Sequence, residues 1–515
     1  MSQLSFWDYS VMGVYMIGVF VLGLVFSGRQ KSLKEYFLAS GNMPWWAVSI
    51  SLYATMLSPL SFLGICGWVF MKDSRWAVGP AVIGVGSMIL AAVIWIPLWG
   101  RLQMMSIYEY LENRFHRGLR AFGAAMFPIA MLFWIGNGLV AAAMAFKAVT
   151  GVPLAHCVIG IVVLGTVYTM LGGSRAVIWT DVAQAAVFFF AFVVIGVLLL
   201  QYFDWQPTKI YNIASSVISE DTGYPKTQMF SAEFELAAEA TIWAIIFTNI
   251  VSALMFGSQQ VQVQRLLASG SKRNMYKSLL GFAGVNVLFV GLAVTAAWGF
   301  VAYYEQNTVA KAMIDHPDQV MPTYVVDNVP FLVRGLIMAG LLAAMMSTFD
   351  SALNSMSSIT VNDFYRRYLV RQRSEIHYVT SSRAITFFWG AVVLAFALWQ
   401  LQHKDSPVLE RVGKLNLLVL SPVGTFFVLG IFTKRCNTLG VLIGGLAAVA
   451  TAMAFSGFPG LMDPWVDPAD FAINWIWLNG LCSAVGFLVG YLASLLFRSP
   501  AADKLKGLTM WTKLD

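Results

Sequence analysis

An apolar run over residues 45–70 is interrupted by the octapeptide Ala54-Thr55-Met56-Leu57-Ser58-Pro59-Leu60-Ser61. Pro59 has no backbone N–H and its ring crowds the preceding turn, so the carbonyl of Thr55 loses its helical partner. Free carbonyls are tolerated inside a bilayer only where they face protein, water or a ligand, and broken helices use them to bind alkali cations. The pattern predicts an ion site at this break. A simple proline kink, repaired by the hydroxyls of Ser58 or Ser61, is the alternative.

The composition of the chain is that of a membrane protein. Of its 515 residues, 58% are apolar and only 11% are charged, whereas about 25% are charged in a typical soluble domain. Apolar runs recur from end to end, each long enough to cross a hydrocarbon core of ~30 Å. Four cysteines are too few for a disulfide framework. We therefore predict one polytopic domain over residues 1–515, embedded in the lipid bilayer of the plasma membrane.

The apolar runs predict thirteen membrane-spanning helices, at residues 6–27, 45–70, 77–100, 121–149, 154–171, 176–202, 238–262, 275–302, 326–359, 383–401, 413–433, 437–456 and 472–497. If the N-terminus is outside, the inner loops and the C-terminal tail carry more than twice as many Lys and Arg residues as the outer loops. This imbalance predicts an external N-terminus and a cytoplasmic C-terminus. It also explains the net charge of +7 without a nucleic acid as partner.

The ninth predicted segment carries polar residues at helical spacing. Those that share one face are Ser347, Asp350, Ser351, Asn354 and Ser358. Small hydroxyl residues also mark close helix packing, which is the alternative for the serines. A carboxylate at the centre of a membrane helix is costly unless it is paired, solvated or bound to a cation. Asp350 therefore favours an ion or proton pathway.

Asp181 is the other carboxylate inside an apolar segment. It lies in the first turns of the sixth predicted helix, so stabilisation by the helix dipole is one explanation. Because hard oxygen donors prevail and no His or Cys cluster lies near either carboxylate, the expected ion is Na⁺ and not a transition metal. The five histidines have no catalytic spacing, and the Gly-Gly pairs have no phosphate-binding context. Nothing in the sequence predicts an enzyme.

Several motifs spread along the chain have to be considered together. They are the break at 54–61, Tyr108-Glu109-Tyr110-Leu111-Glu112 with Arg114-Phe115, Gly172-Gly173 with Val177-Ile178-Trp179-Thr180-Asp181-Val182, Gln264-Arg265, Ser347 to Asn354, and Gly430-Ile431-Phe432. Together they resemble the sodium/solute symporter family, which includes sodium-coupled sugar, proline and sialic acid transporters. The resemblance implies an all-α fold of the leucine-transporter type, with two inverted repeats of five helices and a site at mid-membrane.

This fold implies a division of the chain into an extra N-terminal helix over 6–27, a first repeat over 45–202, a second repeat over 238–433, and two C-terminal helices over 437–497. The protein is expected to function as a monomer.

The resemblance also implies ion-binding residues. The family's common sodium site corresponds to the backbone carbonyls of Ala54, Leu57 and Ala344 and the side-chain oxygens of Ser347 and Thr348. Some members similar to the sialic acid transporter have a second sodium site, whose pattern falls on Asp181, Ser347, Asp350 and Ser351. In that pattern the position of Asp350 is usually a hydroxyl residue. A carboxylate there either strengthens sodium binding or exchanges a proton for one sodium, so we expect one or two Na⁺ ions.

The resemblance does not identify the solute. The carboxylate-binding arginine of sialic acid transporters falls on Trp134 and their pocket glutamine on Val82, while the lysine of the sugar carriers falls on Asn286. The remaining candidates for a substrate pocket are Met56, Ser58, Ser61, Trp134, Gln259 and Gln260. A tryptophan with neutral hydrogen-bonding groups suits a sugar-like solute, and sialic acid or another organic acid is the alternative.

We therefore expect a secondary active transporter, in which inward Na⁺ movement drives the uptake of a small hydrophilic solute by alternating access. Bound Na⁺ would hold residues 54–57 in the geometry that presents Ser58 and Ser61 to the solute, so that each ligand raises the affinity of the other. Asp350 suggests a proton-coupled carrier as the alternative. An ion channel with the same oxygen donors, or a membrane-embedded sensor, is a more distant one.

Overall fold

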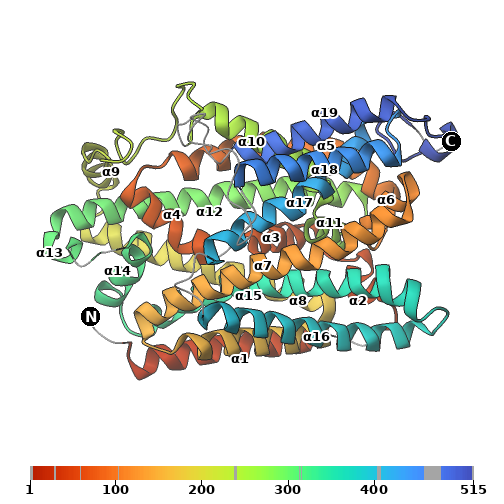
Figure 1. Ribbon diagram of the computed structural model, residues 1–515. Helices are drawn as coiled ribbons and strands as arrows, with labels where there is room; N and C mark the ends of the chain where they lie inside the picture. Colours follow the sequence, from red (N-terminus) through yellow and green to blue (C-terminus); the bar gives the residue numbers. More distant parts are fainter. Residues whose placement is uncertain are drawn as a thin grey trace.

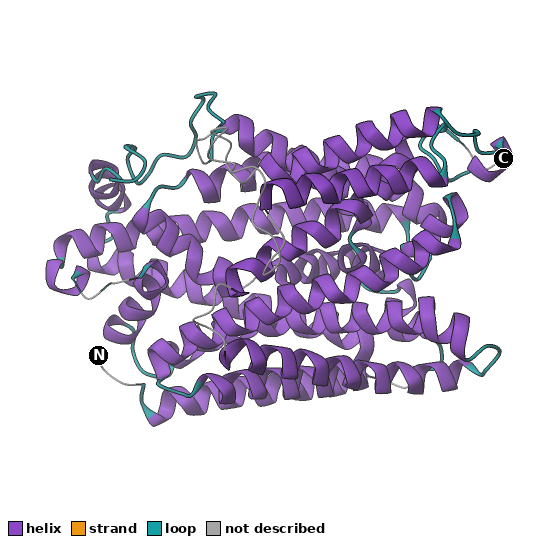
Figure 2. Ribbon diagram, viewed as in Figure 1, coloured by secondary structure: helices purple, strands orange, loops and turns teal. Residues whose placement is uncertain are grey.

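The computed structural model describes residues 4–27, 30–57, 59–102, 104–236, 240–312, 314, 316–402, 408–456 and 477–512. Within these ranges the secondary structure is helical, apart from one isolated bridge between Ile218 and Pro225 (Figure 2). Nine of the described helices are apolar and long enough to cross a membrane, and eleven such spans result if each of two bent pairs counts as one. The predicted all-α membrane fold is confirmed.

The long helices form one bundle (Figure 1). In chain order they are α1 (Phe6–Ser27), α3 (Trp45–Met56), α4 (Pro59–Met71), α5 (Arg75–Leu102), α7 (Arg117–Thr150), α8 (Leu154–Tyr202), α10 (Ile242–Met255), α11 (Gln260–Ala268), α12 (Lys272–Gln306), α15 (Val333–Ile359), α16 (Glu375–Gln402), α17 (Val408–Phe432), α18 (Thr438–Ser456) and α19 (Leu478–Leu495). Shorter helices connect them: α2 (Leu33–Leu38), α6 (Tyr108–Arg114), α9 (Pro207–Ser216), α13 (Thr308–Lys311) and α14 (Val320–Asn328).

These helices differ from the predicted segments at two places. The predicted segment 326–359 is divided between α14 and α15, because Pro330 lies in the gap between them and cannot continue a helix. The predicted segment 238–262 is broken after Met255 and continues as α11. The starts of two predicted segments, 238–239 and 472–476, lie outside the described residues.

Helix α8 is interrupted at Gly173, which has φ 59° and ψ −161°. A Cβ at this position would lie 2.5 Å from the carbonyl oxygen of Tyr36, so only glycine fits. The 49 residues of α8 would span about 74 Å as one straight helix, more than twice the thickness of a hydrocarbon core of ~30 Å. The break at Gly173 divides α8 into the two helices that the sequence predicts at 154–171 and 176–202.

The bundle has two distinct ends (Figure 1). At the end that carries the N-terminus, α13 and α14, the Arg334 guanidinium pairs with Asp8 at 2.6 Å and joins α15 to α1. At the opposite end, which carries the C-terminus and α6, the Tyr110 hydroxyl donates to the carbonyl of Leu508 at 3.0 Å. We refer to them as the N-terminal end and the C-terminal end.

The most buried helix is α15. Every residue from Ile337 to Ile359 is buried, and the helix packs against α1, α3, α7, α8 and α16. Helix α1, in contrast, lies at the periphery, where Val14 and Ile17 are 70% and 64% exposed. The polar stripe of α15 therefore lies at the centre of the bundle. Of the two bent helix pairs, α3 and α4 both contact α15, and α11 contacts it from the pair α10 and α11.

Candidate functional site

The end of α3 contributes backbone oxygens to the centre of the bundle. Helix α3 ends at Met56, and Leu57 adopts an extended conformation with φ −77° and ψ 112°. Pro59 then begins α4 without a donor for the preceding turn. Pro59 therefore offers no N–H to the carbonyl of Thr55, and the carbonyls in this stretch belong to the buried residues Ala54, Thr55 and Leu57.

Two hydroxyls of α15 meet these carbonyls. The Ser347 hydroxyl lies 2.8 Å from the carbonyl oxygen of Ala54 and 3.1 Å from that of Ala344. The Thr348 hydroxyl lies 3.1 Å from the carbonyl oxygen of Leu57 and 3.2 Å from that of Ala344. All five oxygens of the first predicted sodium site are therefore neighbours, and we call them the α3–α15 oxygen cluster. Five uncharged hard oxygens suit a monovalent alkali cation, because Ca²⁺ and Mg²⁺ prefer sites with carboxylates.

The residues of the second predicted site lie next to this cluster and carry charge. The Asp181 carboxylate accepts a hydrogen bond from Ser51 at 2.5 Å and pairs with the Arg265 guanidinium at 3.6 Å. The same guanidinium donates to the Ser351 hydroxyl at 2.5 Å. The helix dipole therefore does not explain Asp181, which lies about two turns beyond the break at Gly173 and whose partners are side chains.

Asp350 completes this group. Its carboxylate accepts a hydrogen bond from the Tyr168 hydroxyl at 2.5 Å and one from Ser351 at 3.4 Å. We call Asp181, Arg265, Asp350 and Ser351 the buried charge cluster, since each is at most 3% exposed. Two carboxylates face one guanidinium, and Oδ1 of Asp181 has no hydrogen-bond partner among the residues that the structure describes. The cluster thus has room, electrostatically, for one more monovalent cation.

Sequence reasoning missed Arg265, which the predicted topology placed in a loop at the cytoplasmic side. The structure places it on α11, buried between α8 and α15. The available signal was the Gln264-Arg265 motif, which carried the family resemblance without a role assigned to it. Ser51 and Tyr168 were missed because an isolated Ser or Tyr in an apolar segment is not distinguishable from a packing residue.

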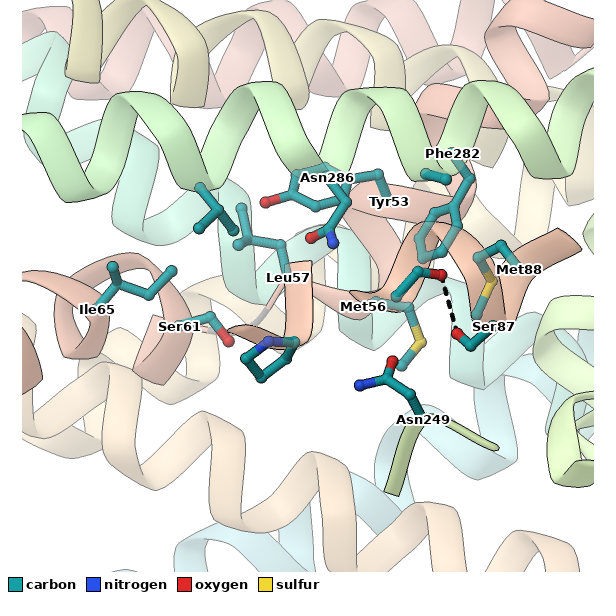
Figure 3. Close-up of a pocket in the computed structure, with 14 residues that line it drawn as sticks. Tyr53, Met56, Leu57, Ser61, Ile65, Ser87, Met88, Asn249, Phe282 and Asn286 are labelled. Atoms are coloured by element: carbon teal, nitrogen blue, oxygen red, sulfur yellow. Dashed lines mark hydrogen bonds between the residues drawn. The ribbon is translucent and has the colours of Figure 1, made fainter. Parts of the chain in front are cut away.

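A cavity of 230 Å³ lies directly beside the break. Met56 and Ser61 line it, as predicted, together with Leu57, whose carbonyl belongs to the α3–α15 oxygen cluster. Two asparagines that were not predicted as pocket residues also line it, Asn249 from α10 and Asn286 from α12. Figure 3 shows both amides directed toward the region around Met56. The α3–α15 oxygen cluster and this cavity therefore share one residue, Leu57.

The other predicted pocket residues lie elsewhere. The Gln260 carboxamide accepts from the backbone N–H of Ile107 at 2.9 Å and donates to the carbonyl of Met105 at 3.0 Å, so it holds the chain before α6 and does not face the cavity. Trp134 packs against the main apolar core. Neither it nor Gln259 belongs to the lining, and Ser58 lies outside the described residues.

A second, wider cavity of 640 Å³ continues from the first toward the N-terminal end. The two share Ser61 and Asn286, and the wider one reaches Trp68 and Trp76. The rings of these tryptophans pack edge to face at 5.8 Å. The two adjoining cavities therefore extend from the break in α3 and α4 toward the N-terminal end of the bundle.

Comparison with known proteins adds to this geometry. The family model of the sodium:solute symporter family matches residues 36–448. A sodium/sialic acid symporter of Aliivibrio fischeri is 28% identical over 498 residues, which cover 96% of this chain and 94% of that protein. A second one, from Proteus mirabilis, is 26% identical over 457 residues and covers 88% of this chain and 90% of that protein.

Among solved structures, a Na⁺-coupled sialic acid symporter in a substrate-bound outward-open state is similar in fold. The TM-score is 0.84 at 24% identity, and the alignment covers 96% of this chain and 99% of the other. At this identity the likeness concerns the fold, which agrees with the predicted transporter architecture.

Proposed function

This chain belongs to the sodium:solute symporter family, and we propose that its α3–α15 oxygen cluster binds the coupling ion. As a member of that family it is a multi-pass plasma-membrane carrier that couples Na⁺ to solute uptake, and it is not an enzyme. The observation that carries the proposal is the meeting of two α15 hydroxyls with three backbone carbonyls within 3.2 Å. Such carbonyls remain free in a bilayer only where they serve a ligand or are repaired by protein. With Na⁺ bound, the hydroxyls of Ser347 and Thr348 would turn their lone pairs to the ion.

We further propose that the buried charge cluster holds a second Na⁺. The extra negative charge of Asp350 supports this, because a buried group with two carboxylates and one guanidinium attracts one more cation. Thr55 links the two sites. Its carbonyl lies 3.2 Å from the Thr348 hydroxyl, and its own hydroxyl shares a hydrogen bond of 2.8 Å with Ser351. Occupation of either site then orders Thr55 for the other, so the two ions bind cooperatively.

The cavity beside the break is the proposed solute site. Among the residues that the structure describes, the fourteen that line it include no Lys, Arg, His, Asp or Glu, and those that line the wider outer cavity include none either. An acid would lose its hydration on this route without meeting a basic partner, which is costly. Amides and hydroxyls from Ser61, Asn249 and Asn286 provide neutral donors and acceptors. This favours an uncharged, sugar-like solute over sialic acid or another organic acid.

Coupling follows from the position of Leu57. Na⁺ bound by its carbonyl holds the end of α3, and this positions Met56 and Leu57 at the wall of the cavity. The solute in turn orders the same wall, so each ligand raises the affinity for the other. Each Na⁺ that accompanies a neutral solute moves one charge, worth about 2.3 kcal/mol per 100 mV.

We also propose the finer architecture that the sequence predicts. It comprises thirteen crossings, repeats over 45–202 and 238–433, flanking helices over 6–27 and 437–497, and a functional monomer. The division of α8 at Gly173 and the bends in α3 with α4 and α10 with α11 support this count. The distribution of Lys and Arg favours an external N-terminal end, so the wider cavity opens to the outside.

Uptake by purified protein in proteoliposomes tests the function. Neutral hexoses and the corresponding hexuronates are offered with an inward gradient of Na⁺ or, as control, of K⁺. We expect saturable accumulation of at least one hexose in Na⁺ only, accompanied by inward positive current. Accumulation of an acid alone would overturn the neutral-solute assignment. Uptake that ignores Na⁺ but follows a pH gradient would establish the proton-coupled alternative, and solute-independent current would establish a channel.

A further inference from the structure

A third cavity, away from the solute route, lies at the N-terminal end of the bundle. It has a volume of 530 Å³, more than twice that of the solute cavity. Its walls come from α8, α9 and α12, and the residues that matter here are Gly196, Leu199, Leu200, Ile210, Tyr211 and Trp298. We call it the α9 crevice. Figure 1 shows α9 at the same end of the bundle as α13 and the N-terminus.

The two polar side chains that α12 contributes to the walls of the α9 crevice, Thr295 and Trp298, are satisfied within the protein. The Thr295 hydroxyl donates to the carbonyls of Gly291 and Leu292 on its own helix, each at 2.9 Å. The Trp298 indole N–H donates to the Ser74 hydroxyl at 2.8 Å, and its ring packs edge to face on Tyr211 at 5.7 Å. What the walls offer to a ligand is therefore the methyl of Thr295, aromatic faces and leucine side chains. Such a surface gains from apolar contact and not from hydrogen bonding.

The crevice is continuous with the lipid-facing surface of the bundle. On α8, Val193 and Val197 lie one turn or less from Gly196 and are exposed, and Leu288 is exposed on α12. Trp205, just before α9, is exposed as well, and tryptophan is enriched where a membrane protein meets the headgroups. Exposed apolar side chains on a membrane-spanning helix face acyl chains, so the nearest apolar ligand is the bilayer itself.

Helix α9 has the character of an interfacial cover. The chain reverses at Asp204 and Trp205, which have positive φ values of 55° and 61°. After this turn α9 packs against α12, with Ile210 buried and with Thr208 and Asn212 at a polar rim of the crevice. An apolar interior with a polar rim at headgroup level matches an amphipathic ligand. We propose that the α9 crevice binds the acyl chain of a bilayer phospholipid, with the headgroup at the rim of α9.

Gly196 provides a variant that fills the crevice. A Cβ at Gly196 would have no heavy atom within 4 Å, and Gly196 lines the crevice, so Gly196→Trp introduces a large ring at the wall of the crevice. Gly160→Trp is the matched control, since Gly160 lies on the same helix and its Cβ position is equally open, but it is far from α9 in the first half of α8. Unchanged Na⁺-dependent thermal stabilisation of both variants shows that they fold.

The probe is phosphatidylglycerol with a photoactivatable diazirine at the end of one acyl chain, added to the full-length protein in nanodiscs. Peptide mass spectrometry locates the crosslinks. In the unmodified protein we expect labelling of residues 196–200 and 207–212. The labelling should fall about tenfold in Gly196→Trp and stay unchanged in Gly160→Trp. A tenfold loss corresponds to the exclusion of about two methylene groups from the crevice. Equal labelling in the two variants would overturn the proposal. Loss of the labelling when a saturating hexose is added in Na⁺ medium would also overturn the proposal.

Discussion

The two broken helices of the bundle are bent to a similar degree, 60° between α3 and α4 and 67° between α10 and α11, but their chemistry is opposite. The first break contains Pro59, and its free carbonyls face the hydroxyls of Ser347 and Thr348. The second has no proline. Its 3₁₀ turn over Phe256–Ser258 contains Gly257, where a Cβ would lie 1.9 Å from the Trp95 ring.

At the second break a backbone carbonyl is paired with a side chain of α5. The Trp95 indole N–H donates to the carbonyl of Ala253 at 2.9 Å, so this carbonyl is occupied by protein. The helix that follows, α11, then delivers the Arg265 guanidinium to Asp181. The first break thus presents the oxygens that we propose bind a cation, whereas the helix after the second break brings the positive charge of Arg265. A bend alone does not make an ion site; what matters is which partners reach the freed carbonyls.

The largest effect, a loss in the free energy of unfolding, is expected from Arg265→Leu. Removal of one partner from a buried ion pair costs about 3–5 kcal/mol, because the remaining charge is left uncompensated. Here Asp181 would lose the guanidinium that pairs with it, and Asp350 would lose the attraction of the same positive charge. The free energy of unfolding in detergent micelles measures this loss. The double variant Arg265→Leu/Asp181→Asn should recover much of it, and Arg371→Leu, at an exposed position, should change it little. A fully stable Arg265→Leu protein would contradict the contrast between the breaks.

The second-largest effect, a smaller loss of stability, is expected from Gly257→Ala at the second break. The added methyl group collides with the Trp95 ring, and overpacking of this kind costs about 1–3 kcal/mol. Gly64→Ala on α4 is the matched control, because a Cβ there has nothing within 4 Å, and Gly to Ala in a helix stabilises by up to about 1 kcal/mol. Thermal unfolding midpoints should therefore move in opposite directions. If they move together, close packing on Trp95 does not hold the second break.

Ser347→Ala tests the first break through its ion. Loss of one of five oxygens should weaken Na⁺ binding about tenfold, or 1.4 kcal/mol, measured as the Na⁺ concentration for half-maximal thermal stabilisation. Ser357→Ala is the control on the same helix, since the Ser357 hydroxyl donates to the carbonyl of Ser382, away from α3. Equal sodium affinities in the two variants would remove the α3–α15 oxygen cluster from the mechanism.

The smallest effect is expected from Pro59→Ala. Pro59 is the first residue of α4, a position where the missing N–H has no helical partner in any case. The contacts of Ser347 and Thr348 with α3 should hold the break without it. Sodium affinity should fall by less than about threefold, or about 0.7 kcal/mol. A loss larger than that of Ser347→Ala would show that the proline, and not the contact with α15, maintains the break.

Sequence reasoning succeeded where the signal is local. Pro59 identified the first break, and the spacing of Ser347, Asp350 and Ser351 identified the face of α15 that lies at the centre of the bundle. It failed where a residue's role depends on a distant neighbour. Gln260 was predicted to face the solute, but its side chain holds the backbone before α6. The second break was not predicted, because no proline marks it in the sequence. The roles of the ion and solute residues stay predictions until the variants are measured.

The order of amino acids by itself determined that this chain crosses a membrane as helices, because the thickness of hydrocarbon and the obligation to pair every backbone group act on each segment separately. Only the tertiary structure decided which buried polar groups meet. Arg265 pairs with Asp181, and Asn249 and Asn286 converge on one cavity, because helices that are distant in sequence pack side by side. The low dielectric constant of the interior then makes each buried charge or amide depend on the partner that this packing supplies.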